Sequence, residues 1–129
     1  MKRRLISGTV VAAVFLAGWL AGQQTKQQVV RQPKTIIHFV ALKWKAGVSD
    51  ADRQKAMDGL KAMASQVPGI KNVWLKTLRV QPQDFNAVYA IEFANQDAAD
   101  DYRDHPAHKA WETEYLKIRE NSISEQATN

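Results

Sequence analysis

Apolar residues at the spacing of β-strands predict four strands beyond residue 34. The segment 35–44 has the strongest pattern. The segments 70–80 and 85–93 have the same period of two and are separated by a turn around Pro82, so they should form an antiparallel hairpin. A weaker pattern over 121–124 predicts a last strand.

The first of these strands is apolar on both faces. One face carries Ile36, His38, Val40, Leu42 and Trp44, and the other carries Ile37, Phe39 and Ala41. Helices packed on one face of a sheet leave its second face open. That second face is buried only if another surface covers it. A two-fold partner using the same surface would do so, and we therefore expect a homodimer.

Helical signals separate the strands. Ser49 begins a helix that Pro68-Gly69 ends, and two further helices are expected over 95–103 and 106–119. The resulting order β-α-β-β-α-α-β predicts the α+β class, a ferredoxin-like split βαβ plan with a four-stranded antiparallel sheet and an extra helix before the final strand.

The N-terminal residues have a different pattern. Lys2, Arg3 and Arg4 precede the uncharged, mostly apolar run 5–21, which indicates an export signal. The run is near the lower length limit for a spanning helix and lacks a clean small-x-small cleavage site, so cleavage and anchoring both stay open. Because the basic residues precede the run, we expect export across the cytoplasmic membrane to a periplasmic or other extracytoplasmic location. The domain would be soluble after cleavage or anchored to the membrane by residues 5–21.

The 129 residues therefore divide into four parts and leave room for one domain. Residues 1–22 are expected to be a signal peptide or signal-anchor helix, and 23–34, which are rich in Gln and charge, a flexible spacer. Residues 35–124 form the domain, and 125–129 are expected to be a disordered tail.

Composition excludes several kinds of function. Three of the 18 basic residues lie in the leader, which leaves 15 against 13 acidic residues and a net charge of +2, so we expect no nucleic-acid partner. The chain contains no cysteine, so disulfides, thiol chemistry and a cysteine-linked lipid anchor are absent. Packing must supply the stability of the domain.

Three segments carry a resemblance to a known family. The segment 102–108 reads Tyr-Arg-Asp-His-Pro-Ala-His, 37–43 reads Ile-His-Phe-Val-Ala-Leu-Lys, and 67–70 reads Val-Pro-Gly-Ile. In this order they resemble the stress-responsive dimeric A/B-barrel (Dabb) family over about 35–124. The resemblance implies a dimeric α+β barrel of ferredoxin-like subunits, no cofactor, and a stress-associated role of undefined activity.

Two functional classes follow from this resemblance. One is a non-enzymatic dimer that binds a small apolar or aromatic molecule in its barrel. The other is a cofactor-free cyclase or lyase, since the family includes plant polyketide cyclases that perform an intramolecular aldol-type condensation. No motif selects the related cofactor-free monooxygenases.

The resemblance implies that Tyr102 and His108 are the catalytic pair of such an enzyme. An aldol-type closure needs a base and a donor for the enolate oxygen, and the helix break at Pro106 would let the two side chains converge. The start of a helix also disfavours a cation, which favours neutral His108. In the alternative interpretation, His105, Pro106 and His108 only start a helix, with His108 bonded to backbone and Tyr102 packed on the sheet.

The remaining candidates concern binding. The residues expected to line a ligand cavity are His38, Val40, Leu42, Tyr89, Phe93 and Trp111; Trp44 and Trp74 are further aromatic candidates, and all of these could instead fill the core or the dimer interface. His105, His108 and Glu112 have spacing that a metal could use, but Pro106 interrupts the helix between the histidines. We therefore expect no metal site.

Overall fold

A computed structural model describes residues 28–81 and 83–129. Their elements are β1 (Ile36–Trp44), α2 (Asp50–Ala64), β2 (Ile70–Trp74), β3 (Ala87–Phe93), α3 (Gln96–Asp104), α4 (Pro106–Ile118) and β4 (Arg119–Ala127). All of them belong to one compact unit, Gln32–Asn129. None of the helices in this part of the chain has the length and apolar character needed to cross a bilayer. The predicted leader, 1–22, lies outside the described residues.

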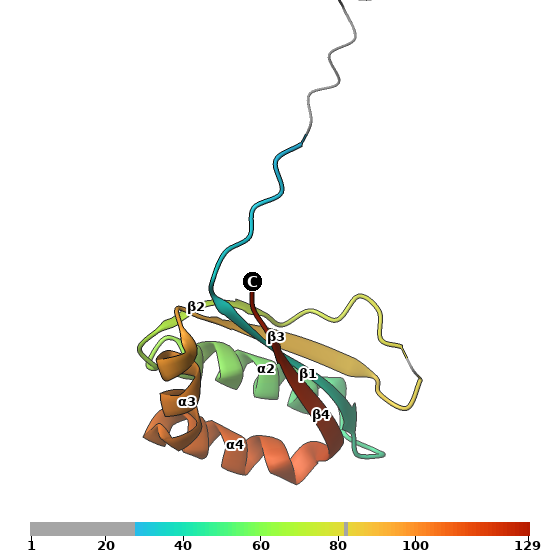
Figure 1. The fold of residues 1–129 in the computed structure, drawn as a ribbon. Helices are drawn as coiled ribbons and strands as arrows, with labels where there is room; N and C mark the ends of the chain where they lie inside the picture. The colour runs from blue at the N-terminus through green and yellow to red at the C-terminus, as the bar shows by residue number, and fades with distance from the viewer. Residues whose placement is uncertain (1–27, 82) are drawn as a thin grey trace, which may run out of the picture. The chain divides into compact units, whose positions relative to one another are not determined.

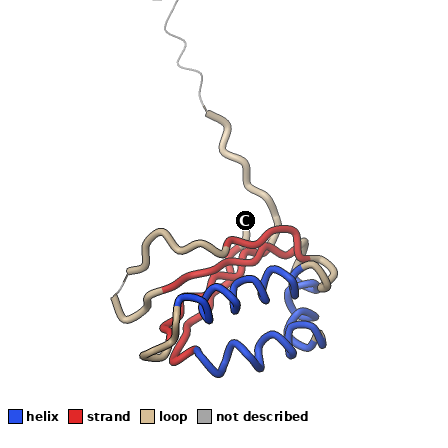
Figure 2. Tube along the Cα trace, turned by 180° about the vertical axis from the view of Figure 1, so that it is seen from behind, coloured by secondary structure: helices blue, strands red, loops and turns tan. Residues whose placement is uncertain are grey.

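The strands form one antiparallel sheet in the order β2-β3-β1-β4. Figure 1 shows α2 and α4 on the same side of this sheet, with α3 at one end of the helical layer, and the reverse view in Figure 2 agrees. The predicted α+β, ferredoxin-like fold is therefore confirmed, including the extra helix before the last strand.

Helix boundaries follow local capping signals. Ser49 caps α2 and Asn95 caps α3 through side-chain oxygens that accept backbone N–H groups three residues further on. His105 ends α3 and also caps α4, because its Nδ1 accepts the backbone N–H of Ala107 at 3.2 Å. With Pro106 in the first turn, the chain changes direction there and continues as a new helix.

Two strand predictions need correction. β2 ends at Trp74 instead of residue 80, and β3 begins at Ala87 instead of 85. Thr77 explains the early end, because its Oγ1 accepts the backbone N–H of Val88 at 2.9 Å and donates to the Val88 carbonyl at 3.1 Å. A side chain thus replaces the backbone partner that a continued strand would supply.

β4 is longer than the predicted 121–124. It runs from Arg119 to Ala127 and so includes most of the predicted disordered tail. Its end is ordered by pairing with β1, in which Phe39 lies opposite Glu125 and Ile37 opposite Ala127. The tail prediction fails because this order comes from a strand distant in sequence.

The core lies between the sheet and the helices. It contains Val40, Leu42, Trp44, Leu60, Met63, Ile91, Phe93 and Trp111, among others. The opposite face of β1 is open in the single chain: Phe39 is 43% exposed, and Ile37 and Ala41 are half-buried. The sequence predicts that both faces of β1 are buried. Within one chain, only the face toward the helices is buried.

Candidate functional site

A cavity of about 340 Å³ lies between the sheet and the helices α3 and α4. The sheet contributes His38 and Val40 from β1, Tyr89 from β3, and Ser122, Ser124 and Gln126 from β4; the helices contribute Tyr102, His108, Trp111, Glu112 and Tyr115. Asp100, Arg103 and Arg119 also line it, so charged and polar groups predominate around the aromatic rings. Most small-molecule sites are more apolar, so a ligand here would need polar groups of its own.

Tyr102 and His108 lie together in this cavity. Tyr102 is near the end of α3 and His108 is in the first turn of α4, so the break at Pro106 brings their rings to 4.0 Å between centroids. The His38 ring, from β1, lies 6.3 Å from that of Tyr102. The structure therefore brings together the two residues predicted as catalytic and His38, which was predicted to line the ligand cavity.

The hydrogen bond of His108 determines which of its nitrogens can accept a proton. Nδ1 lies 3.1 Å from the backbone oxygen of Arg103. A carbonyl oxygen only accepts, so Nδ1 carries the proton and donates it. In the neutral ring Nε2 is then the acceptor. The predicted hydrogen bond between His108 and the backbone is present. It holds the ring with Nε2 free to accept a proton, as a general base requires.

The other two members of the cluster have shifted acidities. Burial, together with the nearby His108, lowers the pKa of His38, and its buried Nδ1 has no hydrogen-bond partner among the described residues. Burial and the Glu112 carboxylate raise the pKa of Tyr102 far above its usual range, so its hydroxyl keeps its proton at neutral pH. The Tyr102 ring also packs on Phe93, with 5.1 Å between centroids.

A second polar group lies at the other end of the cavity, and sequence reasoning missed it. Tyr115 is buried, and its Oη has no hydrogen-bond partner among the described residues. The Arg119 guanidinium lies 5.6 Å from the centre of the Tyr115 ring, and its Nη1 donates to Ser122 Oγ. The available signal was the spacing of His108, Trp111, Tyr115 and Arg119, which follows one face of a helix.

The predicted binding residues do not all reach the cavity. His38, Val40, Tyr89 and Trp111 line it, whereas Leu42 and Phe93 are fully buried core residues outside its lining. The remaining tryptophan candidates are also elsewhere. Trp44 packs edge-on against Tyr115 in the core, and Trp74 is 51% exposed on the open face of the sheet.

Residues 28–81 and 83–129 contain no group of three or more His, Cys, Asp or Glu side chains placed to hold a metal ion. His105 and His108, the histidines weighed as metal ligands, have separate partners. His105 Nδ1 accepts from the Ala107 backbone, and His108 Nδ1 donates to the Arg103 carbonyl.

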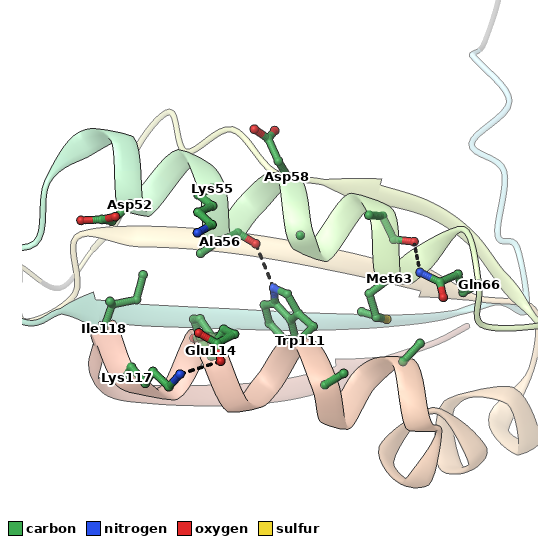
Figure 3. Close-up of a pocket in the computed structure, with 15 residues that line it drawn as sticks. Asp52, Lys55, Ala56, Asp58, Met63, Gln66, Trp111, Glu114, Lys117 and Ile118 are labelled. Atoms are coloured by element: carbon green, nitrogen blue, oxygen red, sulfur yellow. Dashed lines mark hydrogen bonds and ion pairs between the residues drawn. The ribbon is translucent and has the colours of Figure 1, made fainter.

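A separate groove lies between α2 and α4, on the helical side of the molecule (Figure 3). Trp111 reaches from α4 across this groove and donates from Nε1 to the Ala56 carbonyl at 2.8 Å. The close approach depends on Gly59, since a Cβ there would lie 3.0 Å from Trp111 Cδ1. Trp111 therefore fixes α4 against α2 while its ring also forms part of the cavity wall.

The sheet order β2-β3-β1-β4 and the single helical layer define a ferredoxin-like α+β protein. The model of the stress responsive A/B barrel domain, Dabb, matches residues 36–124. The chain belongs to the Dabb family. No curated protein sequence matches it significantly.

Solved structures share this fold at low sequence identity. A Dabb family protein with a ferredoxin-like fold from Mesorhizobium loti is 21% identical, with a TM-score of 0.65 over 74% of this chain and 96% of that one. A dimeric ferredoxin-like protein from Thermobifida fusca is 19% identical, with a TM-score of 0.62 over 79% and 97%. The hydroxynitrile lyase of Passiflora edulis is 15% identical, with a TM-score of 0.66 over 74% and 93%.

Proposed function

We propose that this protein is a homodimer that binds a small, partly aromatic molecule in the cavity between the sheet and the helices α3 and α4. The observation that carries the proposal is the pairing of a partly open cavity of about 340 Å³ with buried polar atoms that have no hydrogen-bond partner among the described residues. These atoms are His38 Nδ1 and Tyr115 Oη. Buried polar groups are normally satisfied, so a polar ligand group is the expected partner.

Ligand binding can be tested by closing the cavity. Ser124 lines it from β4 and is exposed, so Ser124→Trp should block access without disturbing the core. Ser65→Trp, at the exposed end of α2, is the matched control. In ligand-observed NMR with a library of aromatic fragments, the wild type and the control should share a set of binders that the Ser124→Trp variant loses. Equal binding by all three proteins would contradict the proposed site.

The dimer is supported by the open face of the sheet. Phe39 in β1, Trp74 in β2 and Ile123 in β4 are 43%, 51% and 51% exposed on the side away from the helices. A second copy presenting the same face would cover these side chains, and the solved structure from Thermobifida fusca is described as dimeric. Light scattering on residues 23–129 should give twice the monomer mass at micromolar concentration. A monomer would contradict the dimer.

An enzyme without a cofactor is the second candidate, favoured by the orientation of His108. With Nδ1 held by the Arg103 carbonyl, Nε2 can take a proton from a carbon beside a carbonyl group. The adjacent Tyr102 hydroxyl, which stays protonated, can donate to the enolate oxygen that forms. The hydroxynitrile lyase of Passiflora edulis has the same fold, which is thus compatible with an enzyme.

The two candidates separate in a His108→Asn variant. The asparagine amide can still donate to the Arg103 carbonyl, so the fold should persist while the base is lost. With β-dicarbonyl compounds as substrates, an enzyme should lose turnover and retain ligand affinity. If the wild type turns over none of these compounds, or the variant turns them over equally, the catalytic assignment is wrong and the binding role stands.

We also propose that the domain acts outside the cytoplasm. Lys2, Arg3 and Arg4 before the apolar run 5–21 support this location. Alkaline phosphatase fused after residue 34 should be active in bacterial cells, because this enzyme matures only after export. Cell fractionation would then distinguish a released domain from an anchored one, and an inactive, cytoplasmic fusion would contradict export.

A further inference from the structure

We propose that Arg119 and Tyr115 form an anion-binding subsite at one end of the cavity, and that the ligand is therefore an aromatic or apolar carboxylic acid. This inference rests on the proposed ligand-binding function and names the chemical class of the ligand.

Arg119 is the cation of this subsite. It is the first residue of β4, directly after α4, and its Nη1 donates to Ser122 Oγ. Its Nε is buried without a hydrogen-bond partner, and no carboxylate among the described residues lies within the 4.0 Å of an ion pair with it. A guanidinium has five donors in a planar fork that matches a carboxylate, so Arg119 retains donors for an oxyanion.

Tyr115 supplies a second donor at the same end. It is 4% exposed and stacks on Trp111, with 4.6 Å between ring centres and 13° between their planes. Burial raises the pKa of Tyr115 to about 12, against the opposing effect of Arg119, so the hydroxyl is a donor at neutral pH. Its buried Oη lies near the Tyr89 and Arg119 side chains but makes no hydrogen bond of acceptable geometry with any described residue. A ligand oxygen would satisfy this hydroxyl and the Arg119 Nε together.

The distribution of charge gives the bound acid a direction. Glu112, which also lines the cavity, raises the pKa of both Tyr102 and Tyr115, and only at Tyr115 does the Arg119 guanidinium oppose this effect. An acid group therefore belongs beside Arg119, with the body of the ligand along Trp111 toward His108. His108 and Tyr115 are two turns of α4 apart, roughly 10 Å, which is the length of a small aromatic acid.

Arg119 also has a structural role that the test must separate from binding. A cation at the C-terminal end of α4 is favourable with the helix dipole, and the guanidinium covers the Tyr115 ring. Loss of either effect would change the affinity for an acid and for its neutral amide by the same factor. Selectivity between the two is therefore the property to measure.

The probes are 3-phenylpropanoate with 3-phenylpropanamide, and indole-3-acetate with indole-3-acetamide. Calorimetry or ligand-observed NMR on residues 28–129, which contain the whole folded unit, gives the affinity for each. Wild-type protein should bind each acid about ten-fold more tightly than its amide, as expected for a charge-assisted contact. Arg119→Met should reduce this preference to about two-fold or less with amide affinity unchanged, since a lone neutral contact adds little. Arg79→Met is the matched control, because Arg79 is an exposed arginine outside the cavity lining, and it should keep the preference.

Circular dichroism shows whether each variant is folded. If Arg119→Met is not folded, Tyr115→Phe provides the test, since this change removes only the hydroxyl group. It should weaken binding of the acids by about five-fold and leave the affinity for the amides unchanged. Equal wild-type affinity for acid and amide, or loss of the preference in Arg79→Met as well, overturns the subsite and leaves the ligand cavity intact. Failure of the wild type to bind any of the four probes overturns the subsite together with the proposed cavity function.

Discussion

At the residue scale, the three histidines of the chain differ in what their ring nitrogens contact. His105 Nδ1 accepts a backbone N–H, His108 Nδ1 donates to a backbone carbonyl, and His38 Nδ1 is buried without a partner among the described residues. His105 therefore has a structural role as a helix cap. His108 and His38 are left as the two histidines that can interact with a ligand in the cavity.

The burial of His38 makes a prediction about stability and pH. Burial and His108 lower its folded-state pKa below the 6.5 of an ordinary histidine. Between these two values the unfolded chain binds more protons, so the free energy of unfolding should fall as the pH drops through 6.5 and level off below the folded-state pKa. Urea unfolding across this range should show a larger loss for wild type than for His38→Gln. Parallel profiles would mean that His38 is not buried as described.

At the element scale, the boundaries that local chemistry sets were predictable from the sequence. Ser49, Asn95 and Pro106 mark the starts of α2, α3 and α4 as predicted, because a cap or a proline acts within one turn of its own helix. The convergence of Tyr102 and His108 followed from the same break. A backbone bond of His108 and packing of Tyr102 on the sheet were predicted as well, but not their particular partners, the Arg103 carbonyl and the Phe93 ring, since these depend on how the helices pack on the sheet.

β4 shows why the remaining part of the site was not predicted. Its cavity-facing residues, Ser122, Ser124 and Gln126, are polar because they line the cavity instead of the core. This removes the apolar alternation by which a half-buried strand is identified. The strand signal is therefore weak where the cavity is, and the subsite formed by Tyr115 and Arg119 beside β4 was missed for the same reason.

The junction between α2 and β2 provides a prediction at this scale. Gly69 has φ +84°, and a Cβ there would overlap the Cβ of Ala98 in α3. Gly69→Ala should therefore cost about 1–2 kcal/mol for the left-handed backbone and about 1–3 kcal/mol more for the overlap. Gly47 has φ +80° with open space around it, so Gly47→Ala should show only the first cost. Equal losses of unfolding free energy in urea would contradict close packing of Gly69 on α3.

At the scale of the whole molecule, the sheet has two faces with different surroundings. The helical side contains the core and the cavity, whereas the open side exposes Phe39, Trp74 and Ile123. The apolar character of both faces of β1 predicted this contrast, because one helical layer covers only one of them. If the open face is the dimer interface, then changes there should alter assembly and leave the cavity residues in place.

Phe39→Glu tests this separation. Phe39 is 43% exposed in the single chain, so a carboxylate there should disturb the monomer little, but in the dimer it would be buried without a partner. Light scattering should therefore show a monomer at concentrations where the wild type is a dimer, with a lower and no longer concentration-dependent melting temperature. Leu116→Glu is the control, since Leu116 is 40% exposed on α4, on the other side of the sheet, and the variant should remain a dimer. A Phe39→Glu dimer beside a Leu116→Glu monomer would place the interface on the helices, and the open face of β1 would then need a different explanation.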